Sequence, residues 1–108
     1  MAGEVIVLIT TSSKEEATAI GRALVDEHLA ACVNIVSEVF SLFFWEGKTQ
    51  HARETLLIVK SNLSLMDKLI TRVKTLHSYS VPEIIALPII SGSQEYLEWL
   101  RSTVKKTV

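Results

Sequence analysis

Three side chains that can carry protons or bind metal lie close together within residues 74–88. This stretch reads KTLHSYSVPEIIALP and contains His77, Tyr79 and Glu83. Its beginning is typical of the end of a helix and its end of a buried strand. Pro82 stiffens the connection, and polar residues on a stiff loop between elements often form a binding site. The alternative is that His77 only caps the helix and Tyr79 only packs on a neighbouring element.

The single cysteine and the three histidines are the other candidate metal ligands. Thiolate and imidazole are ligands that copper and zinc accept readily. The chain has no CxxC motif and no two histidines one helical turn apart, so a site would have to assemble in three dimensions or across subunits. Cys32 lies in the apolar segment LAACV, where the alternative role is that of a small buried hydrophobic residue.

The same residues give little support for catalysis or nucleotide binding. His77 and Glu83 could act as acid and base, but no local motif places a nucleophile beside a base. There is no GxGxxG or Walker A motif, and the four glycines are spread apart. We therefore expect neither an enzyme nor an organic cofactor.

Length and composition predict one globular domain, residues 1–108, with 48% hydrophobic residues and a net charge of -1. A nucleic-acid partner is not expected, because that partner requires a basic surface. The N-terminal apolar run covers only Val5–Ile9 without a basic segment before it, which predicts no signal peptide and no membrane span. A single cysteine suits a reducing compartment, so we expect a cytoplasmic protein with no membrane partner.

The pattern of apolar residues predicts the order β-α-β-β-α-β-α. A capping box at Ser12 or Ser13 opens the first helix, whose apolar stripe reaches His28. A cap at Ser64 opens a second helix, which extends to Leu76 or His77. The strands are expected at 5–9, 32–45, 51–60 and 81–90, and the last helix at 94–105. The first six elements form the ferredoxin-like βαββαβ pattern, so the predicted fold class is α+β with a C-terminal helix.

The hairpin formed by residues 32–60 is unusually long for a chain of this size. Fourteen extended residues, Cys32 to Trp45, would span about 46 Å, and typical strands have about 5–6 residues. A slip in the alternation near Ser37 and Glu38 predicts a bulge, and EGK predicts the turn. The hairpin either folds back on its own sheet or pairs with another subunit. We favour the second, because exposed strand edges and apolar residues require a partner.

Short blocks along nearly the whole chain resemble the CutA divalent-cation-tolerance family. They are LAACVNI at 29–35, WEGK at 45–48, Glu54, Lys60, HxYxxPE at 77–83 and YLxW at 96–99. The resemblance implies a tight homotrimer similar to that of the PII signalling proteins, in which the long hairpins pair between subunits. It also implies a pocket between subunits, lined by Cys32, Trp45, Glu54, Lys60, His77, Tyr79 and Glu83.

The resemblance further implies tolerance to copper and other divalent ions, with copper binding in some members. His77 and Cys32 would then be soft metal ligands, and Glu54 and Glu83 hard ligands or anchors for Lys60. Some bacterial relatives carry a copper-linked cysteine and a second histidine at the positions of Ile9 and Leu76. In addition, Ser78 replaces the usual loop proline and Phe43 replaces the usual hairpin tyrosine.

The first functional hypothesis is therefore a homotrimer that binds copper(II) or another divalent metal at a pocket between subunits. An alternative is a PII-like module that binds a small anionic ligand through Lys60. A third possibility, an enzyme that uses His77 and Glu83, lacks any indicated substrate.

Overall fold

The computed structural model describes residues 3–105 as a four-stranded antiparallel sheet with three α-helices and one short 3-10 helix. The elements are, in chain order, β1 (Glu4–Thr11), α1 (Lys14–Asp26), β2 (Cys32–Trp45), β3 (Lys48–Asn62), η1 (Leu63–Leu65), α2 (Met66–Leu76), β4 (Ile84–Pro88) and α3 (Gln94–Lys105).

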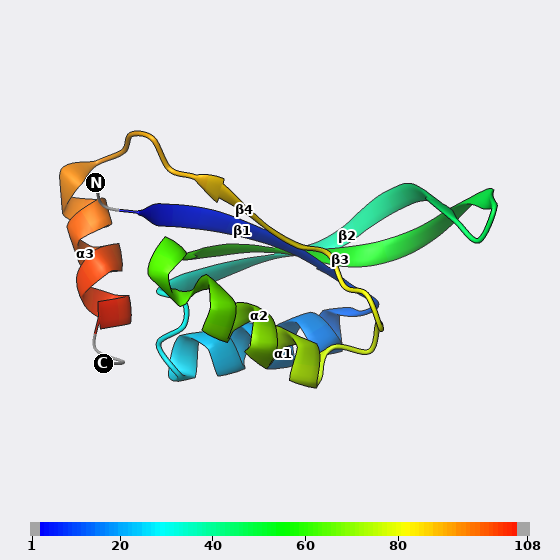
Figure 1. The fold of residues 1–108 in the computed structure, drawn as a ribbon, viewed down its shortest axis with the longest axis horizontal. Coiled ribbons are helices and arrows are strands. Elements are labelled where there is room, and N and C mark those ends of the chain that lie inside the picture. Colours follow the sequence, from blue (N-terminus) through cyan, green and yellow to red (C-terminus); the bar gives the residue numbers. More distant parts are fainter. Residues whose placement is uncertain (1–2, 106–108) are drawn as a thin grey trace.

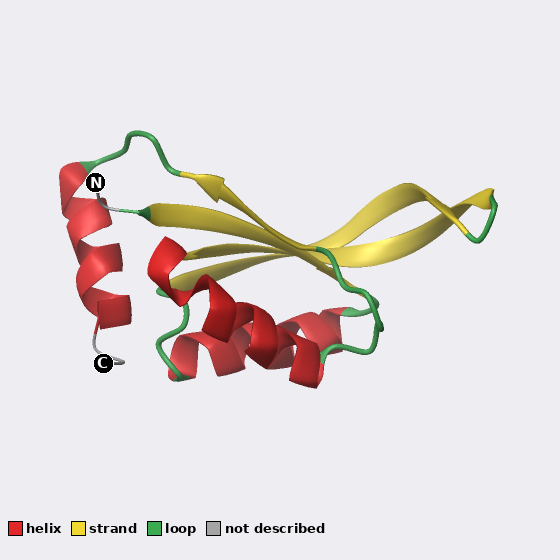
Figure 2. Cartoon of the chain, in the orientation of Figure 1, coloured by secondary structure: helices red, strands yellow, loops and turns green. Residues whose placement is uncertain are grey.

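The strands are arranged in the order β2-β3-β1-β4, and all neighbours are antiparallel. Helices α1 and α2 cover one face of the sheet, and α3 lies at the end opposite the hairpin (Figures 1 and 2). This arrangement confirms the predicted ferredoxin-like α+β fold with an added C-terminal helix. The ion pair between Arg101 Nε and Glu4 Oε2, at 2.8 Å, ties α3 to the start of β1.

Alternate residues of the central strands form the core under α1 and α2. Val7 and Ile9 of β1 and Leu57 and Val59 of β3 have no exposed surface, and they form one cluster with the helices. The residues between them lie on the opposite face, which α1 and α2 leave uncovered (Figure 1). That open face is apolar in the middle of the sheet and carries Ile6, Leu8, Leu56, Ile58, Ile85 and Leu87.

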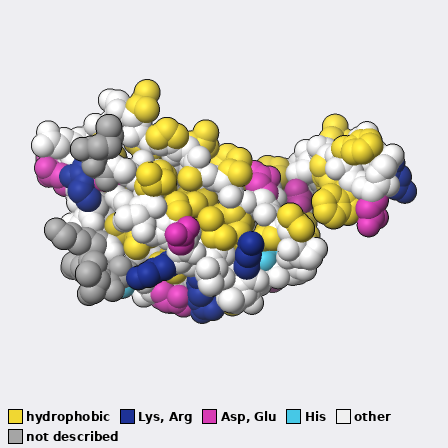
Figure 3. Space-filling model, in the orientation of Figure 1, with side chains coloured by type: hydrophobic (Ala, Val, Ile, Leu, Met, Phe, Trp, Pro, Cys, Tyr) yellow, Lys and Arg dark blue, Asp and Glu magenta, His cyan; other side chains and the backbone are white. Residues whose placement is uncertain are grey.

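The hairpin projects from the body and forms a separate lobe (Figure 3). The predicted bulge is confirmed, because Ser37 and Glu38 together oppose a single residue of β3. The turn consists of Glu46 and Gly47, both with positive φ (53° and 81°), a conformation that matches the twist of a tight hairpin. Beyond the bulge several apolar side chains are largely exposed, with exposed fractions of 61% for Phe40, 68% for Leu42 and 72% for Phe44.

Several predicted boundaries were wrong. The stripe of the first helix was predicted to reach His28, but α1 ends at Asp26 and His28 lies beyond it with a positive φ of 60°. The returning strand begins at Lys48 rather than at 51, because the tight turn lets Trp45 pair directly with Lys48. The last strand covers only Ile84–Pro88, since it pairs with β1 alone and residues 81–83 belong to the preceding loop. The predicted cap at Ser64 is replaced by Asn62, whose side chain accepts the Ser64 N–H at the start of η1.

Candidate functional site

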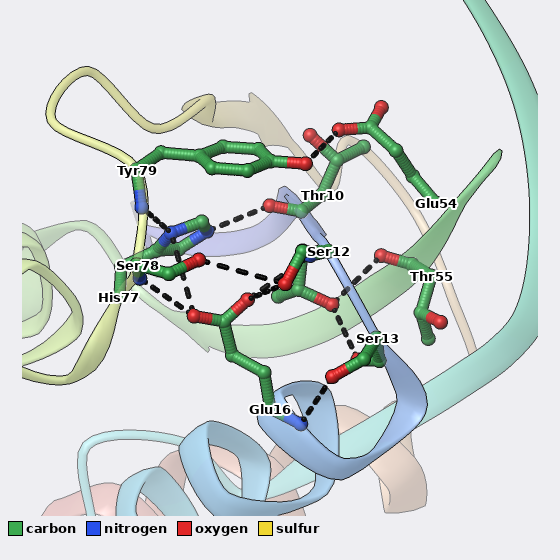
Figure 4. Close-up of polar contacts among 10 residues, drawn as sticks. Thr10, Ser12, Ser13, Glu16, Glu54, Thr55, His77, Ser78 and Tyr79 are labelled. Carbon is green, nitrogen blue, oxygen red and sulfur yellow. Dashed lines mark hydrogen bonds and ion pairs between the residues drawn. The ribbon is translucent and has the colours of Figure 1, made fainter. Parts of the chain in front are cut away.

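Three parts of the fold meet at the base of the hairpin. The end of β1, the start of α1 and the loop that follows α2 converge there, beside the bulge that separates the hairpin from the body (Figure 4). His77 ends α2, because its extended backbone (φ -87°, ψ 140°) turns the chain away from the helix axis. The loop that begins at His77 carries Tyr79 and Glu83. The junction between α2 and β4 therefore positions all three candidate residues of the segment 74–88.

His77 is fixed by hydrogen bonds at both ring nitrogens. Its Nε2 lies 2.8 Å from the carbonyl oxygen of Thr10, and its Nδ1 lies 3.0 Å from the backbone nitrogen of Tyr79. A carbonyl can only accept and an amide N–H can only donate, so Nε2 carries the proton and Nδ1 accepts. The side chain has no exposed surface. The imidazole therefore joins the end of β1 to the start of the loop.

Glu16 connects α1 to the same loop. Its carboxylate accepts hydrogen bonds from the backbone N–H and hydroxyl of Ser12, at 3.0 and 2.9 Å, and from the backbone N–H of Ser78, at 2.6 Å. Burial opposes ionisation of this carboxyl, but the hydrogen bonds from Ser12 and Ser78 outweigh it and lower the pKa of Glu16. The N-cap itself is Ser13, whose hydroxyl accepts the Glu16 N–H.

Tyr79 and Glu54 form the contact that faces the hairpin. The Tyr79 hydroxyl donates to Glu54 Oε2 at 2.7 Å (Figure 4). Burial, followed by this hydrogen bond and the charges of Glu54 and Glu16, raises the pKa of Tyr79 to about 12. Glu54 is only 8% exposed, and its Oε1 has no partner within residues 3–105.

A cavity of about 640 Å³, the hairpin-base pocket, lies beside this contact. Its walls come from the hairpin, the end of β1 and the loop after α2. The lining residues are Thr10, Ser41, Leu42, Phe43, Trp45, Glu54, Tyr79, Ser80, Val81 and Glu83. Among these residues, all within the described part of the chain, two are acidic and none is basic. The pocket therefore favours a cation over an anion.

The structure divides the sequence-predicted site residues into two groups. Trp45, Glu54, Tyr79 and Glu83 line the hairpin-base pocket, and His77 packs against Tyr79 with ring centroids 4.8 Å apart. Cys32 and Lys60 pair with each other farther along the hairpin strands. Lys60 lies six residues beyond Glu54 on β3, which corresponds to about 20 Å along a strand. One chain alone does not bring the two groups together.

Cys32 and Lys60 have their own neighbours near α3. The Lys60 ammonium donates to the side-chain oxygen of Asn34, and the Cys32 thiol lies 4.0 Å from the same oxygen. Burial, followed by the adjacent Cys32 thiol, raises the pKa of Tyr96 on α3. Within residues 3–105 no group of three or more His, Cys, Asp or Glu residues is arranged to hold a metal ion.

Sequence reasoning missed Thr10 and Glu16 as site residues, and it noted Ser78 only as the replacement for a loop proline. Thr10 contributes a backbone carbonyl, which no side-chain pattern reveals. Glu16 has the spacing of a capping box, but its contact with Ser78 spans 62 positions of the sequence. The hairpin strands are longer than typical strands, and this length was the local sign that one wall of the pocket lies on a projecting hairpin.

Fold and site together define a class: a ferredoxin-like α+β domain with a long projecting hairpin and an acidic, aromatic-walled pocket at the hairpin base. The family model described as "CutA1 divalent ion tolerance protein" matches residues 5–103. The chain belongs to this family, which is named for tolerance of divalent ions rather than for a reaction.

Individual relatives agree in sequence and in structure. A divalent-cation tolerance protein CutA from Thermus thermophilus is 53% identical over 98 residues, covering 91% of this chain and 95% of the relative. The solved structure described as divalent cation tolerance protein Cut A1 from that organism has a TM-score of 0.91 at 52% identity and covers 93% of this chain and 97% of that one. The CutA1 structure from Oryza sativa has a TM-score of 0.90 at 46% identity, with 93% and 92% covered.

The relatives differ in the compartments that their names give. A rice relative, 45% identical over 95% of this chain and 58% of its own length, is called chloroplastic. An Archaeoglobus fulgidus protein, with a TM-score of 0.90 at 42% identity over 94% of this chain and 98% of its own, is called periplasmic. Among the described residues of the present chain, no helix has the length and apolar character needed to cross a membrane.

Proposed function

We propose that this protein binds a divalent metal ion at the hairpin-base pocket and that this binding supports divalent-cation tolerance. The observation that carries the proposal is the presence of two carboxylates, Glu54 and Glu83, in a pocket whose lining residues include no basic side chain. Carboxylate oxygens are ligands for divalent ions, including zinc and copper(II). Copper(II) is the first ion to test, and zinc the second.

Glu54 and Glu83 differ in how firmly they are held. Glu54 is buried and oriented by Tyr79, which leaves Oε1 available to an ion. Glu83 is exposed and forms no hydrogen bond or ion pair within residues 3–105. Two carboxylates do not complete a coordination shell, so water or a neighbouring subunit would supply the other ligands.

His77 takes the role of a positioning residue in this proposal. It could coordinate an ion only by giving up the Tyr79 N–H or the Thr10 carbonyl, because both nitrogens are already engaged. Cys32 could join the site only from a second subunit, since in one chain it lies toward α3. Substitution of each residue therefore tests whether a soft ligand takes part.

We infer that the functional unit is a single domain, residues 1–108, assembled as a homotrimer. Support comes from the apolar open face of the sheet and from the exposed aromatic side chains of the hairpin, which leave large apolar surfaces for neighbouring copies to cover. A cytoplasmic location and a non-enzymatic role complete this proposal. Light scattering that gives the 12.0 kDa mass of one chain would overturn the homotrimer.

The alternative of an anionic ligand has less support at this pocket. Lys60, its expected partner, donates to Asn34 and does not line the hairpin-base pocket. An anion would also meet two carboxylates there, and like charges disfavour one another. An anion site at Lys60 would have to form near α3 or between subunits.

Calorimetric titration with copper(II) and zinc tests the metal proposal. Glu83→Gln and Glu54→Gln should each weaken binding about tenfold or more, while Glu95→Gln on α3 makes the same change of charge away from the pocket. Binding that is absent, or equal in all three variants, would overturn the proposal. Binding lost only in His77→Ala or Cys32→Ser would place the ion at the soft ligands instead.

A further inference from the structure

Glu16 makes more contacts than a helix cap requires. It is the third residue of α1, whose N-cap is Ser13. Its Oε1 accepts the backbone N–H and the hydroxyl of Ser12, which is the kind of contact expected of a capping residue. Its Oε2 accepts the backbone N–H of Ser78 at 2.6 Å, and Ser78 belongs to the loop between α2 and β4. One carboxylate therefore ties the first turn of α1 to a loop that lies 62 positions away in the sequence.

The bond from Ser78 to Glu16 holds the loop between its two aromatic residues. The Ser78 N–H belongs to the peptide unit that joins this residue to His77, and a peptide unit is planar, so Glu16 fixes the orientation of the whole unit. The next N–H, that of Tyr79, donates to His77 Nδ1 at 3.0 Å. Side chains therefore hold two consecutive amides of the loop. The bond to the carboxylate is charge-assisted, which makes it the stronger of the two.

This anchoring determines where the Tyr79 phenol lies. The ring of Tyr79 packs against His77 with centroids 4.8 Å apart, and its hydroxyl reaches Glu54 Oε2 at 2.7 Å. Hydrogen bonds weaken steeply with distance and angle, so a loop displaced by about 1 Å would take this donor away from Glu54. The contacts that lead from Glu16 to Glu54 all join residues of one chain, so they do not depend on what covers the pocket.

We propose that Glu16 is a positioning residue, which anchors the loop through the Ser78 N–H so that Tyr79 orients Glu54 toward a bound ligand. The inference rests on the proposed function for the identity of that ligand, a divalent metal ion, but not for the anchoring itself. The competing role is that Glu16 only caps α1. In that role its charge in the first turn matters, and its reach to Ser78 does not.

Two substitutions separate the reach of the side chain from its charge. Glu16→Asp keeps the charge in the first turn but withdraws the carboxylate from the loop by one methylene group. Glu16→Gln removes the charge but keeps the length and an acceptor oxygen for Ser78. Positioning predicts that Glu16→Asp loosens the loop more than Glu16→Gln, whereas capping alone predicts the reverse order. Glu15→Asp is the matched control, because Glu15 is an exposed residue of the same turn.

Amide hydrogen exchange at neutral pH measures the anchoring directly. In Glu16→Asp the Ser78 and Tyr79 amides should exchange about tenfold or more faster than in the native protein, while the buried amides of β1 change far less. Glu16→Gln should have a smaller effect on the loop, and Glu15→Asp should have none. The proposal is overturned if Glu16→Asp leaves both loop amides unchanged, if it speeds β1 to the same extent, or if Glu16→Gln loosens the loop more.

A double-mutant cycle extends the test from the loop to Glu54. The cost of Tyr79→Phe in denaturation experiments should fall by roughly half or more in the Glu16→Asp background, because the phenol then no longer meets the carboxylate in the native geometry. All proteins of the cycle are compared at one protomer concentration. Equal costs in the two backgrounds would contradict the positioning of Tyr79 by Glu16.

Metal titration connects the anchoring to the site. Glu16→Asp should weaken the binding of copper(II) or zinc about tenfold, the effect of losing a group that orients a ligand, and Glu15→Asp should not. Native affinity in a variant whose loop amides exchange faster would overturn the connection. If the native protein binds neither ion, the proposed function fails, and the exchange rates and the double-mutant cycle still decide whether Glu16 positions Tyr79.

Discussion

Tyr79→Phe should destabilise the folded protein by about 2 kcal/mol, because a hydrogen bond to a charged group contributes about 1.5–3 kcal/mol. The change removes the one donor that Glu54 has within residues 3–105 and leaves a carboxylate that is only 8% exposed. Water replaces the lost donor incompletely at such a site. The phenol recovers some solvation in the unfolded chain, which places the expected value toward the lower part of that range.

A double-mutant cycle with Glu54→Gln separates the charge from the packing. Glutamine keeps the shape and an acceptor oxygen, so the phenol would donate to a neutral group, worth about 1 kcal/mol. Tyr79→Phe should then cost about 1 kcal/mol less in the Glu54→Gln background than in the native protein. This difference is the coupling that the 2.7 Å contact predicts.

Guanidinium denaturation at one fixed protomer concentration measures all four proteins, because stability of an oligomer depends on concentration. Tyr96→Phe on α3 is the matched control, as it removes the other tyrosine hydroxyl. A cost of Tyr79→Phe no greater than that of the control would refute a stabilising hydrogen bond between Tyr79 and Glu54. An equal cost in the two backgrounds would refute the contribution of the Glu54 charge.

Two further predictions concern pH. In a Tyr96→Phe background, absorbance should show the Tyr79 phenolate forming near pH 12, and Glu54→Gln should lower this pKa while burial keeps it above 10.0. Because the folded pKa of Tyr79 is raised, the protonated phenol contributes its full stabilisation below about pH 10. That stabilisation is lost as the pH rises through about 12. Titration of Tyr79 at the ordinary pKa of a phenol would contradict its burial. Glu16→Gln should cost about 1 kcal/mol at neutral pH, since it weakens hydrogen bonds to a carboxylate. Because the folded pKa of Glu16 is lowered, the cost of Glu16→Gln should persist above the ordinary pKa of 4.5 and disappear as the pH falls through the folded pKa. Denaturation curves that show the same cost at every pH would contradict this prediction.

Much of the fold follows from local patterns in the sequence. The continuous apolar run of β1, the capping serine of α1 and the turn at Glu46 and Gly47 each depend on neighbours a few positions away. The bulge near Ser37 was also predictable, because a change in alternation is itself local. The last strand was harder to predict, since β4 is an edge strand whose extent depends on where β1 pairs with it.

The candidate site was only partly predictable. The segment HxYxxPE identified the loop that lines the pocket, and the proline explained why that loop holds its shape. The pairing of Tyr79 with Glu54 spans 25 positions, and the contact between His77 and Thr10 spans 67. No periodicity carries such information, because these contacts depend on how the elements pack.

The sequence by itself determined the secondary structure, the order of the elements and the ferredoxin-like pattern, because short-range propensity and alternation control these features. Only the tertiary structure decided that Glu54 and Glu83 share a pocket, that both nitrogens of His77 are occupied and that Cys32 and Lys60 lie elsewhere in the chain. The physical reason is that charge, burial and hydrogen-bond partners belong to positions in space. Residues far apart in the sequence acquire them only when the sheet brings its strands together.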